Sequence, residues 1–428
     1  MGGDSTLVAI CEVRRQSFRQ IPVSNPLSGL KISLRLARIK VNKGRNLMRT
    51  QPGFVSNLCL VSLILIAGGM DSTAAPESKA PKPDLTRSKV GSVFSAPVAH
   101  GENLYFVSTT GVLYEADSEM KKIKKLFEGK KQSTGAITLS GDTLYWGEGL
   151  HGDTSTELHS YDLKKKKIGP SFKVTGHVER PVLASGGSLY VPMGPGGIAR
   201  LDSETAKGKA TGSYKETWRT SQHGAKPLHI DSNLVEYQSE VCAASVYEVK
   251  GLICFDKATG KETRFHELKR DPKGQLGTSK DLIYGFATSG NLLEPKFDIP
   301  SDFYVVDLKE KKLRFEKELR GFNFFAPPVE KNEAFLTLST GDFILLNLVT
   351  QKITFLGEFP EPFINPPFRM NEDYCGIGIM GKFNCYTKTQ DMSPAVSKDS
   401  RILETVIGEV SVLNSRIYLP TRIGFSVQ

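Results

Sequence analysis

Side chains that can bind metals or move protons gather at residues 151–159. His151 and Asp153 flank a glycine, and Glu157 and His159 follow shortly after. Imidazole nitrogens and carboxylate oxygens ligate zinc and act as general acids and bases. The spacing matches no established ligand motif, and His159 falls inside an expected strand. We therefore predict a hydrogen-bonded loop here, and we assign no metal site, no cofactor and no catalytic residue.

Candidates for partner binding lie where the chain departs from its own periodicity. Long segments at residues 147–157, 239–250 and 288–302 separate expected strands, and shorter segments join one repeat to the next. Their aromatic, Arg and His side chains are of the types that dominate binding energy at interfaces. Trp218 is one of only two tryptophans, and packing over a sheet edge explains it equally well. The partner-binding candidates are His151, Asp153, His177, Arg180, Trp218, His223, Arg320, Phe322 and Phe324.

Four cysteines beyond residue 75 form two close pairs. Cys242 and Cys254 flank one expected hairpin, and Cys375 and Cys385 flank another. Each pair is placed to face across adjacent strands and to form a disulfide in an oxidising compartment. Four buried free thiols are the alternative, because a small apolar Cys also suits a strand interior.

A unit of strand, turn and strand recurs after residue 94. Short apolar and aromatic runs alternate with Gly, Asn, Asp and Ser turns, and no long segment has a helical period. The pattern predicts an all-β fold with about eight repeats. In the fourth repeat, the expected first strand is at residues 227–228 and the second begins at Leu234. The repeats begin at Pro97, Ala136, Pro181, Pro227, Gln275, Pro328, Pro367 and Glu409.

Six expected third strands end on Asp or Asn. Successive ends are 40 to 54 residues apart, which is the length of a four-stranded propeller blade. The terminal side chain can accept backbone N–H bonds in the turn that follows, so we interpret these residues as turn formers. They are Asp117, Asp162, Asp202, Asp256, Asp307 and Asn347.

Residues 255–265 resemble the docking repeat of propellers of the pyrroloquinoline-quinone (PQQ) type. The family pattern is Ala-x-Asp-x-x-Thr-Gly-Lys-x-x-Trp, and this sequence reads Phe-Asp-Lys-Ala-Thr-Gly-Lys-Glu-Thr-Arg-Phe, with Phe in place of the Trp. The resemblance implies a β-propeller of about eight four-stranded blades, with seven as the alternative. The ring is expected to close by pairing of N- and C-terminal strands. Residues 410–428 supply three expected strands, and a strand near residues 87–94 is expected to complete that blade.

An apolar stretch at residues 55–69 follows Arg49 and precedes small residues. It is short for a bilayer span and is typical of a secretory signal peptide. We expect residues 1–47 to be a non-native upstream extension or disordered, 48–75 a signal peptide, 76–90 a linker and 91–428 the propeller. A membrane anchor is the alternative if the signal is not cleaved. The residues before Cys59 lack the small side chains of a lipobox.

The formal net charge of +10 is concentrated near the N-terminus. Residues 1–75 hold 10 Lys and Arg and 3 Asp and Glu, which gives +7. The remainder has 46 basic and 43 acidic residues, or +3. A nearly neutral body gives no support for nucleic-acid binding.

These features favour a non-enzymatic binding scaffold that is periplasmic or secreted. The chain is similar to the propeller lipoproteins of the bacterial outer-membrane β-barrel assembly machinery, although the missing lipobox is a departure. We expect a monomer that engages a protein or cell-envelope component through the loop-bearing face of the ring, and membrane association is left open. A propeller hydrolase or lyase and a quinoprotein dehydrogenase are the alternatives. No Cys-Cys, Gly-x-Ser-x-Gly or His-Glu-x-x-His motif occurs in the sequence.

Overall fold

The computed structural model describes residues 90–206, 209–290, 297–370, 373–387, 405–406 and 408–427. The expected upstream extension at 1–47, the signal peptide at 48–75 and all but the last residue of the linker at 76–90 lie outside these ranges. The regular structure of the described ranges consists of β-strands. None of these ranges contains a helix with the length and apolar character needed to cross a bilayer.

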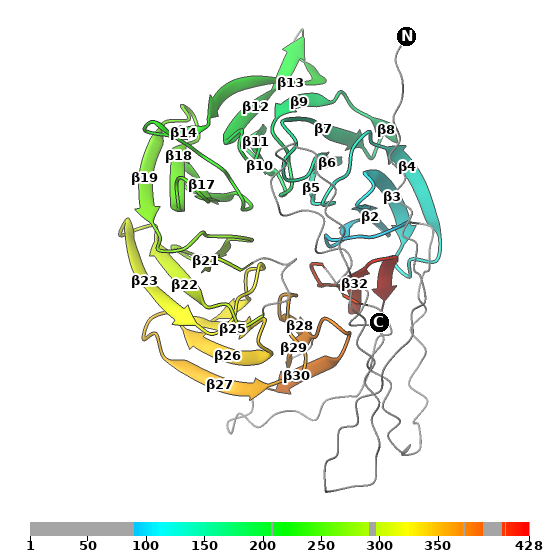
Figure 1. Cartoon of the computed structure of the whole chain (residues 1–428). Coiled ribbons are helices and arrows are strands. Elements are labelled where there is room, and N and C mark those ends of the chain that lie inside the picture. Colours follow the sequence, from blue (N-terminus) through cyan, green and yellow to red (C-terminus); the bar gives the residue numbers. More distant parts are fainter. Residues whose placement is uncertain are drawn as a thin grey trace, which may run out of the picture. The chain divides into compact units, whose positions relative to one another are not determined.

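Eight antiparallel sheets, numbered here as blades 1 to 8, follow one another around a common centre in chain order (Figure 1). Blade 1 contains β1 (Val98–His100), β2 (Asn103–Val107), β3 (Val112–Asp117) and β4 (Ile123–Glu128). Blade 2 contains β5 (Ile137–Ser140), β6 (Thr143–Gly147), β7 (Ser155–Asp162), β8 (Lys167–Ile168) and β9 (Phe172–Thr175). Blade 3 contains β10 (Leu183–Ser185), β11 (Ser188–Pro192), β12 (Ile198–Ala206) and β13 (Lys209–Thr220). The hairpin of β14 (Gln222–His223) and β15 (Lys226–Pro227) follows.

The remaining blades continue the ring. Blade 4 contains β16 (Val235–Tyr237), β17 (Glu240–Ser245), β18 (Gly251–Asp256) and β19 (Glu262–Glu267). Blade 5 contains β20 (Gly277–Ser279), β21 (Leu282–Thr288), β22 (Ser301–Asp307) and β23 (Lys312–Leu319). Blade 6 contains β24 (Val329–Glu330), β25 (Glu333–Thr337), β26 (Asp342–Asn347) and β27 (Ile353–Glu358). The described strands of blade 7 are β28 (Phe368–Met370), β29 (Asp373–Ile377) and β30 (Phe383–Thr387), and those of blade 8 are β31 (Ser411–Leu413), β32 (Arg416–Thr421) and β33 (Gly424–Val427).

The prediction of an all-β propeller with about eight blades is confirmed, and the alternative of seven blades is wrong. One local prediction also fails. In blade 4, residues 227–228 do not form the first strand, because Pro227 belongs to the β14–β15 hairpin. The first strand is β16, and the turn to β17 follows it at Gln238, which has a positive φ of 54°.

Hydrophobic packing fills each interface between successive blades instead of forming one central core. Each of the eight buried clusters in the described ranges combines residues of two neighbouring blades. Between blades 1 and 2, for example, Val107 and Leu113 pack with Leu144 and the fully buried Trp146. Burial of such large side chains is the main favourable term in folding. The blades are therefore held together by their flat faces.

The ring closes where blade 8 meets blade 1, as Figure 1 shows for β32 beside β2 and β3. Phe106 and Phe425 stack edge to face at 5.1 Å, and the hydroxyl of Tyr418 donates to the carbonyl oxygen of Ser118 at 2.8 Å. The expected completing strand at residues 87–94 is not formed within its described part, residues 90–94. This segment leads directly into the innermost strand of blade 1. Its backbone contacts with blade 8 are isolated hydrogen bonds, from Val93 N–H to the carbonyl oxygen of Thr421 in β32 at 3.1 Å and from Glu409 N–H to the carbonyl oxygen of Phe94 at 2.8 Å.

The polar ends of the third strands act as turn formers, as predicted. Asp256 accepts the backbone N–H of Thr259 at 2.9 Å, and equivalent bonds form at Asp117, Asp162, Asp307 and Asn347. Asp202 is the exception. Its carboxylate instead accepts bonds from Ser188, Thr217 and Arg200, because β12 and β13 continue as a long hairpin beyond it.

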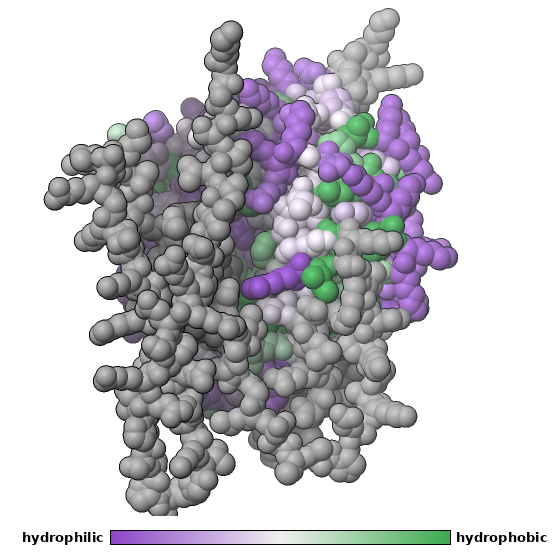
Figure 2. Space-filling model, turned by 45° about the vertical axis from the view of Figure 1, so that its right-hand side comes forward, coloured by the Kyte–Doolittle hydropathy of each residue, from purple (hydrophilic) through white to green (hydrophobic). Residues whose placement is uncertain are grey.

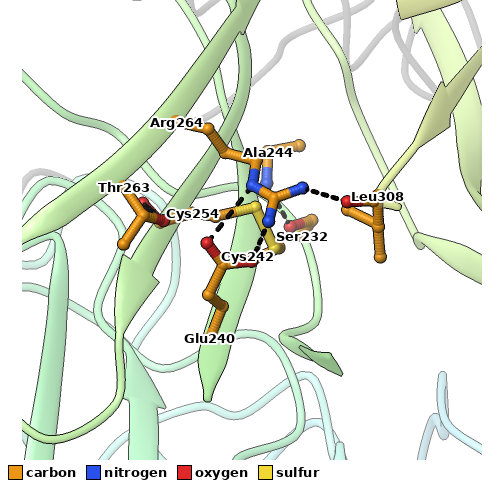
Figure 3. Close-up of a disulfide and its surroundings, with 8 residues drawn as sticks. All are labelled: Ser232, Glu240, Cys242, Ala244, Cys254, Thr263, Arg264 and Leu308. Atoms are coloured by element: carbon orange, nitrogen blue, oxygen red, sulfur yellow. Dashed lines mark hydrogen bonds and ion pairs between the residues drawn. A yellow bond between two sulfur atoms is a disulfide. The ribbon is translucent and has the colours of Figure 1, made fainter. Parts of the chain in front are cut away.

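Both predicted cysteine pairs are disulfides. Cys242 and Cys254 are direct partners on β17 and β18, and Cys375 and Cys385 are direct partners on β29 and β30. Figure 3 shows the first of these disulfides beside the side chain of Arg264. The alternative of four free thiols is therefore wrong.

Where Figure 2 shows described residues, hydrophilic side chains surround smaller hydrophobic areas. Large hydrophobic side chains are exposed at only a few described positions. These are Phe94, Ile168, Tyr247, Val349, Ile353, Phe355 and Met380. Three of them lie in loops on one face of the ring, as described below.

Candidate functional site

One face of the ring carries two kinds of loop. Because the strands of each blade are antiparallel, the loop between its second and third strands leaves on the same face as the connection to the next blade. We call this the loop-bearing face. It holds the loop between β6 and β7, the loop between β17 and β18, and the segments that precede β10, β16 and β20.

Three histidines from three separate segments meet on the loop-bearing face. His151 lies between β6 and β7, His177 follows β9, and His229 precedes β16. Their ring centroids are 5.6, 5.0 and 5.7 Å apart, and one nitrogen of each ring lies within 4.8 Å of one nitrogen of both others. His151 is exposed, His229 is half-buried and His177 is buried.

Local hydrogen bonds fix the loop that carries His151. The Asp153 carboxylate accepts the backbone N–H of Leu150 at 3.0 Å and pairs with Lys131 at 2.7 Å. The hydrogen bond from Lys131 is the main reason that the pKa of Asp153 lies below its usual value. The predicted hydrogen-bonded loop is thus present, and Asp153 acts within it as a turn former.

Close backbone packing positions the other two histidines. Gly194 has a φ of +55°, and a Cβ there would lie 2.3 Å from Nε2 of His177. The residue must therefore be glycine for His177 to occupy its place. The backbone N–H of His229 donates to Oγ of Ser245 at 3.2 Å, and the next residue, Ile230, pairs with both Gly194 and Ser245.

The environment of the cluster keeps His229 neutral near pH 7. Burial lowers the pKa of His229 to about 4, and the neighbouring His151 acts in the same direction. The Nδ1 atom of His177 has no hydrogen-bond partner among the described residues, while its Nε2 lies 3.8 Å from Oε1 of Glu179. At His177, therefore, no described side chain or backbone group occupies the Nδ1 atom.

Tyr247 covers one side of this cluster. It lies in the loop between β17 and β18, has 48% of its surface exposed, and adopts a positive φ of 68°. Its ring stands edge-on to His229 with centroids 4.9 Å apart, and its hydroxyl lies 3.5 Å from Nε2 of His151. An aromatic hydroxyl is thus exposed beside the histidines.

Arg180 lies in a polar network near the centre of the ring. Its guanidinium pairs with Asp231 at 3.1 Å and lies close enough to Glu409 to favour the ionised carboxylate. Glu409 also accepts a hydrogen bond from the side chain of Gln275. Because Gln275 precedes blade 5 and Glu409 precedes blade 8, this contact joins blades that are not neighbours.

Glu409 provides a test of this central network. Burial, only partly offset by Gln275 and Arg180, raises the pKa of the Glu409 carboxyl. The folded state then binds more protons than the unfolded state between the usual carboxyl pKa of about 4.3 and the raised value, so stability falls as pH rises through this window. Glu409→Gln should unfold at a higher temperature than wild type at pH 8, and the difference should vanish near pH 4. An advantage that persists unchanged at pH 4 would contradict this account.

Trp218 and His223 lie on the segment that precedes blade 4, and both contact that blade. The indole N–H of Trp218 donates to the carbonyl oxygen of Lys257 at 3.0 Å, and its ring packs on Gly260. His223 pairs with Glu262 at 2.8 Å. These contacts support the interpretation of Trp218 as a packing residue at a blade edge.

The three candidates between blades 5 and 6 differ in exposure. Arg320 is exposed, whereas Phe322 is 1% exposed and Phe324 is 9% exposed. The two phenylalanine rings pack edge to face at 5.2 Å. Their side chains belong to the interior, so of these three only Arg320 presents a side chain to solvent. Partner binding by any of the nine candidates stays a prediction.

Sequence reasoning missed His229 as a member of the site. Residues 227–234 were interpreted as two strands and a turn, which placed His229 inside a repeat instead of in a connection. Tyr247 lay within the segment 239–250 that the sequence marked as irregular, but much of that segment is strand β17. The segment 239–250 was nevertheless expected on the loop-bearing face with Tyr247 as its aromatic residue, so only His229 was missed.

Comparison with known proteins supports the fold. No protein-family model matches the sequence, and no curated protein matches it, so the PQQ-type repeat stays a prediction. Among solved structures, BamB from Moraxella catarrhalis matches with a TM-score of 0.60 at 13% identity, covering 80% of this chain and 99% of BamB. The computationally designed Ika8 protein matches with a TM-score of 0.45 at 9% identity, covering 70% of this chain and 96% of the design. The chain therefore shares the BamB fold over nearly the whole of BamB.

Proposed function

We propose that this protein is an exported, non-enzymatic scaffold that binds a protein or cell-envelope partner through the loop-bearing face of its propeller. The observation that carries the proposal is the eight-bladed ring, whose fold matches 99% of BamB. This agrees with the resemblance to propeller lipoproteins of the outer-membrane assembly machinery that the repeats suggest.

The two disulfides support export. Cys242–Cys254 and Cys375–Cys385 each join adjacent strands. Structural disulfides persist in oxidising compartments such as the periplasm and are rare in the cytosol. The apolar stretch at residues 55–69 is the expected signal for reaching such a compartment.

Exposed apolar side chains support the choice of face. Phe94 enters blade 1, Tyr247 lies between β17 and β18, and Met380 lies between β29 and β30, so all three belong to the loop-bearing face. Their exposed fractions are 43%, 48% and 55%. Aromatic residues and Met are enriched in the cores of protein interfaces. Three such side chains from different blades offer anchors for a partner that spans the face.

Photocrosslinking in cells tests this assignment. A photoreactive amino acid at Tyr247 or Met380 should crosslink the chain to the same partner. Phe355 on the outer strand β27 is the matched control, because it is 60% exposed but lies off the loop-bearing face. Crosslinks at Phe355 and none at the loop positions would show that another surface binds the partner.

A further inference from the structure

Three of the seven histidines of the chain converge at one point of the loop-bearing face, although they lie far apart in the sequence. One ligand-type nitrogen of each ring lies within 4.8 Å of the other two, so donor atoms from three separate segments face one place. The buried His177 keeps a ring nitrogen without a partner, and an unpaired buried polar atom is costly. These two features call for a ligand that accepts several lone pairs at once.

We propose that His151, His177 and His229 bind a divalent transition-metal ion of the zinc class. Zinc is held by three histidines and an open fourth position in one established type of site, with Zn–N distances of about 2.0–2.1 Å. A tetrahedral arrangement at that distance needs ligand nitrogens about 3.3 Å apart. The observed nitrogens lie within 4.8 Å of one another, so metal binding requires side-chain rotations and a small shift of the exposed His151 loop.

The surrounding groups fit this assignment. Glu179 lies 3.8 Å from Nε2 of His177, which is slightly longer than a hydrogen bond. A small movement on metal binding would let its carboxylate accept the Nε2–H, orient the imidazole and leave Nδ1 for the ion. The hydroxyl of Tyr247 beside His151 marks the solvent-exposed side, where a water molecule or a partner group can occupy the fourth position. Nitrogen ligands select Zn²⁺, Cu²⁺, Ni²⁺ or Co²⁺ over Ca²⁺ and Mg²⁺, which prefer oxygen.

A second cluster of ligand-type residues does not carry the same inference. Glu240, Cys242 and Cys254 also lie within 4.8 Å of one another. Both sulfurs are consumed by a disulfide, and the Glu240 carboxylate pairs with Arg264. The histidine cluster is therefore the candidate whose donor atoms remain available.

The metal site goes beyond the proposed function, because the three imidazoles can bind an ion without any partner. Calorimetric titration of the untagged, metal-free full-length chain with Zn²⁺ tests it. We expect one ion per chain at this site and a rise in the unfolding temperature of about 2 °C or more at excess Zn²⁺. Co²⁺ should give the visible absorption bands of a low-coordinate nitrogen site, and Ca²⁺ should have no effect.

Variants identify the ligands. His151→Ala changes an exposed loop and should fold normally. Loss of an outer-shell partner weakens metal binding about 10- to 100-fold, and loss of the ligand His151 should weaken Zn²⁺ binding by more than that. His229→Ala should do the same, and Glu179→Gln should weaken binding by about tenfold. His100→Ala is the matched control, because His100 pairs with Asp142 elsewhere. Equal Zn²⁺ affinity of wild type, His151→Ala and His229→Ala would overturn the proposal, whether or not the loop-bearing face binds a partner.

Discussion

Arg264→Met should lower the free energy of unfolding by about 3–5 kcal/mol, because it leaves a buried carboxylate without its partner. The side chains of Arg264 and Glu240 are only 8% and 10% exposed. The guanidinium binds both carboxylate oxygens and also donates to the carbonyl oxygen of Leu308 at 2.7 Å (Figure 3). Leu308 belongs to blade 5, so the same side chain links blades 4 and 5.

Urea unfolding of matched variants isolates this effect. Arg219→Met removes an ion pair with Glu216 at a more exposed position and should cost less than about 1 kcal/mol. The double change Arg264→Met with Glu240→Leu should recover most of the loss, since no buried charge remains. If Arg264→Met is as stable as Arg219→Met, the buried charge of Glu240 does not depend on Arg264 for its stability.

The double change Cys242→Ala with Cys254→Ala should lower the free energy of unfolding by about 2–3 kcal/mol. The disulfide closes a loop with a sequence separation of 12, and a cross-link of this span restricts the unfolded chain by about that amount. Both positions are fully buried, and Ala keeps them apolar.

Redox conditions provide the control for the disulfide. Wild type and the double variant should differ in denaturant midpoint under oxidising conditions, and a reducing agent should remove most of this difference. The Cys375–Cys385 pair encloses a similar span and should behave alike. A difference that is the same with and without reductant would mean that side-chain packing, and not the cross-link, stabilises blade 4.

The fold was predictable because its periodicity is local. Each third strand ends on a turn-forming residue such as Asp256, and a regular interval between such residues implies one blade per repeat. The prediction of the first strand failed in blade 4. There, Pro227 and the turn-like residues at 231–233 have the sequence pattern of a strand followed by a turn. In the structure, β16 pairs with β17 and is therefore the first strand of blade 4. Such pairing is a property of the folded chain.

The site was less predictable than the fold, for a geometric reason. His151 and His177 were singled out from the irregular segments, but their distance from His229 depends on how three successive blades stack. The sequence also could not distinguish an exposed aromatic anchor from a packed one. Trp218 proved to contact blade 4, whereas Tyr247, in another of the irregular segments, is 48% exposed.

The affinity for the partner that crosslinks at Tyr247 is the most direct test of the scaffold proposal. With purified components, Tyr247→Ala combined with Met380→Ala should weaken binding by about tenfold or more, as expected when interface anchors are truncated. Phe355→Ala, on the outer strand of blade 6, should bind like wild type. Unchanged affinity in the loop-face variant together with weakened binding in Phe355→Ala would contradict the assignment of the loop-bearing face as the binding surface.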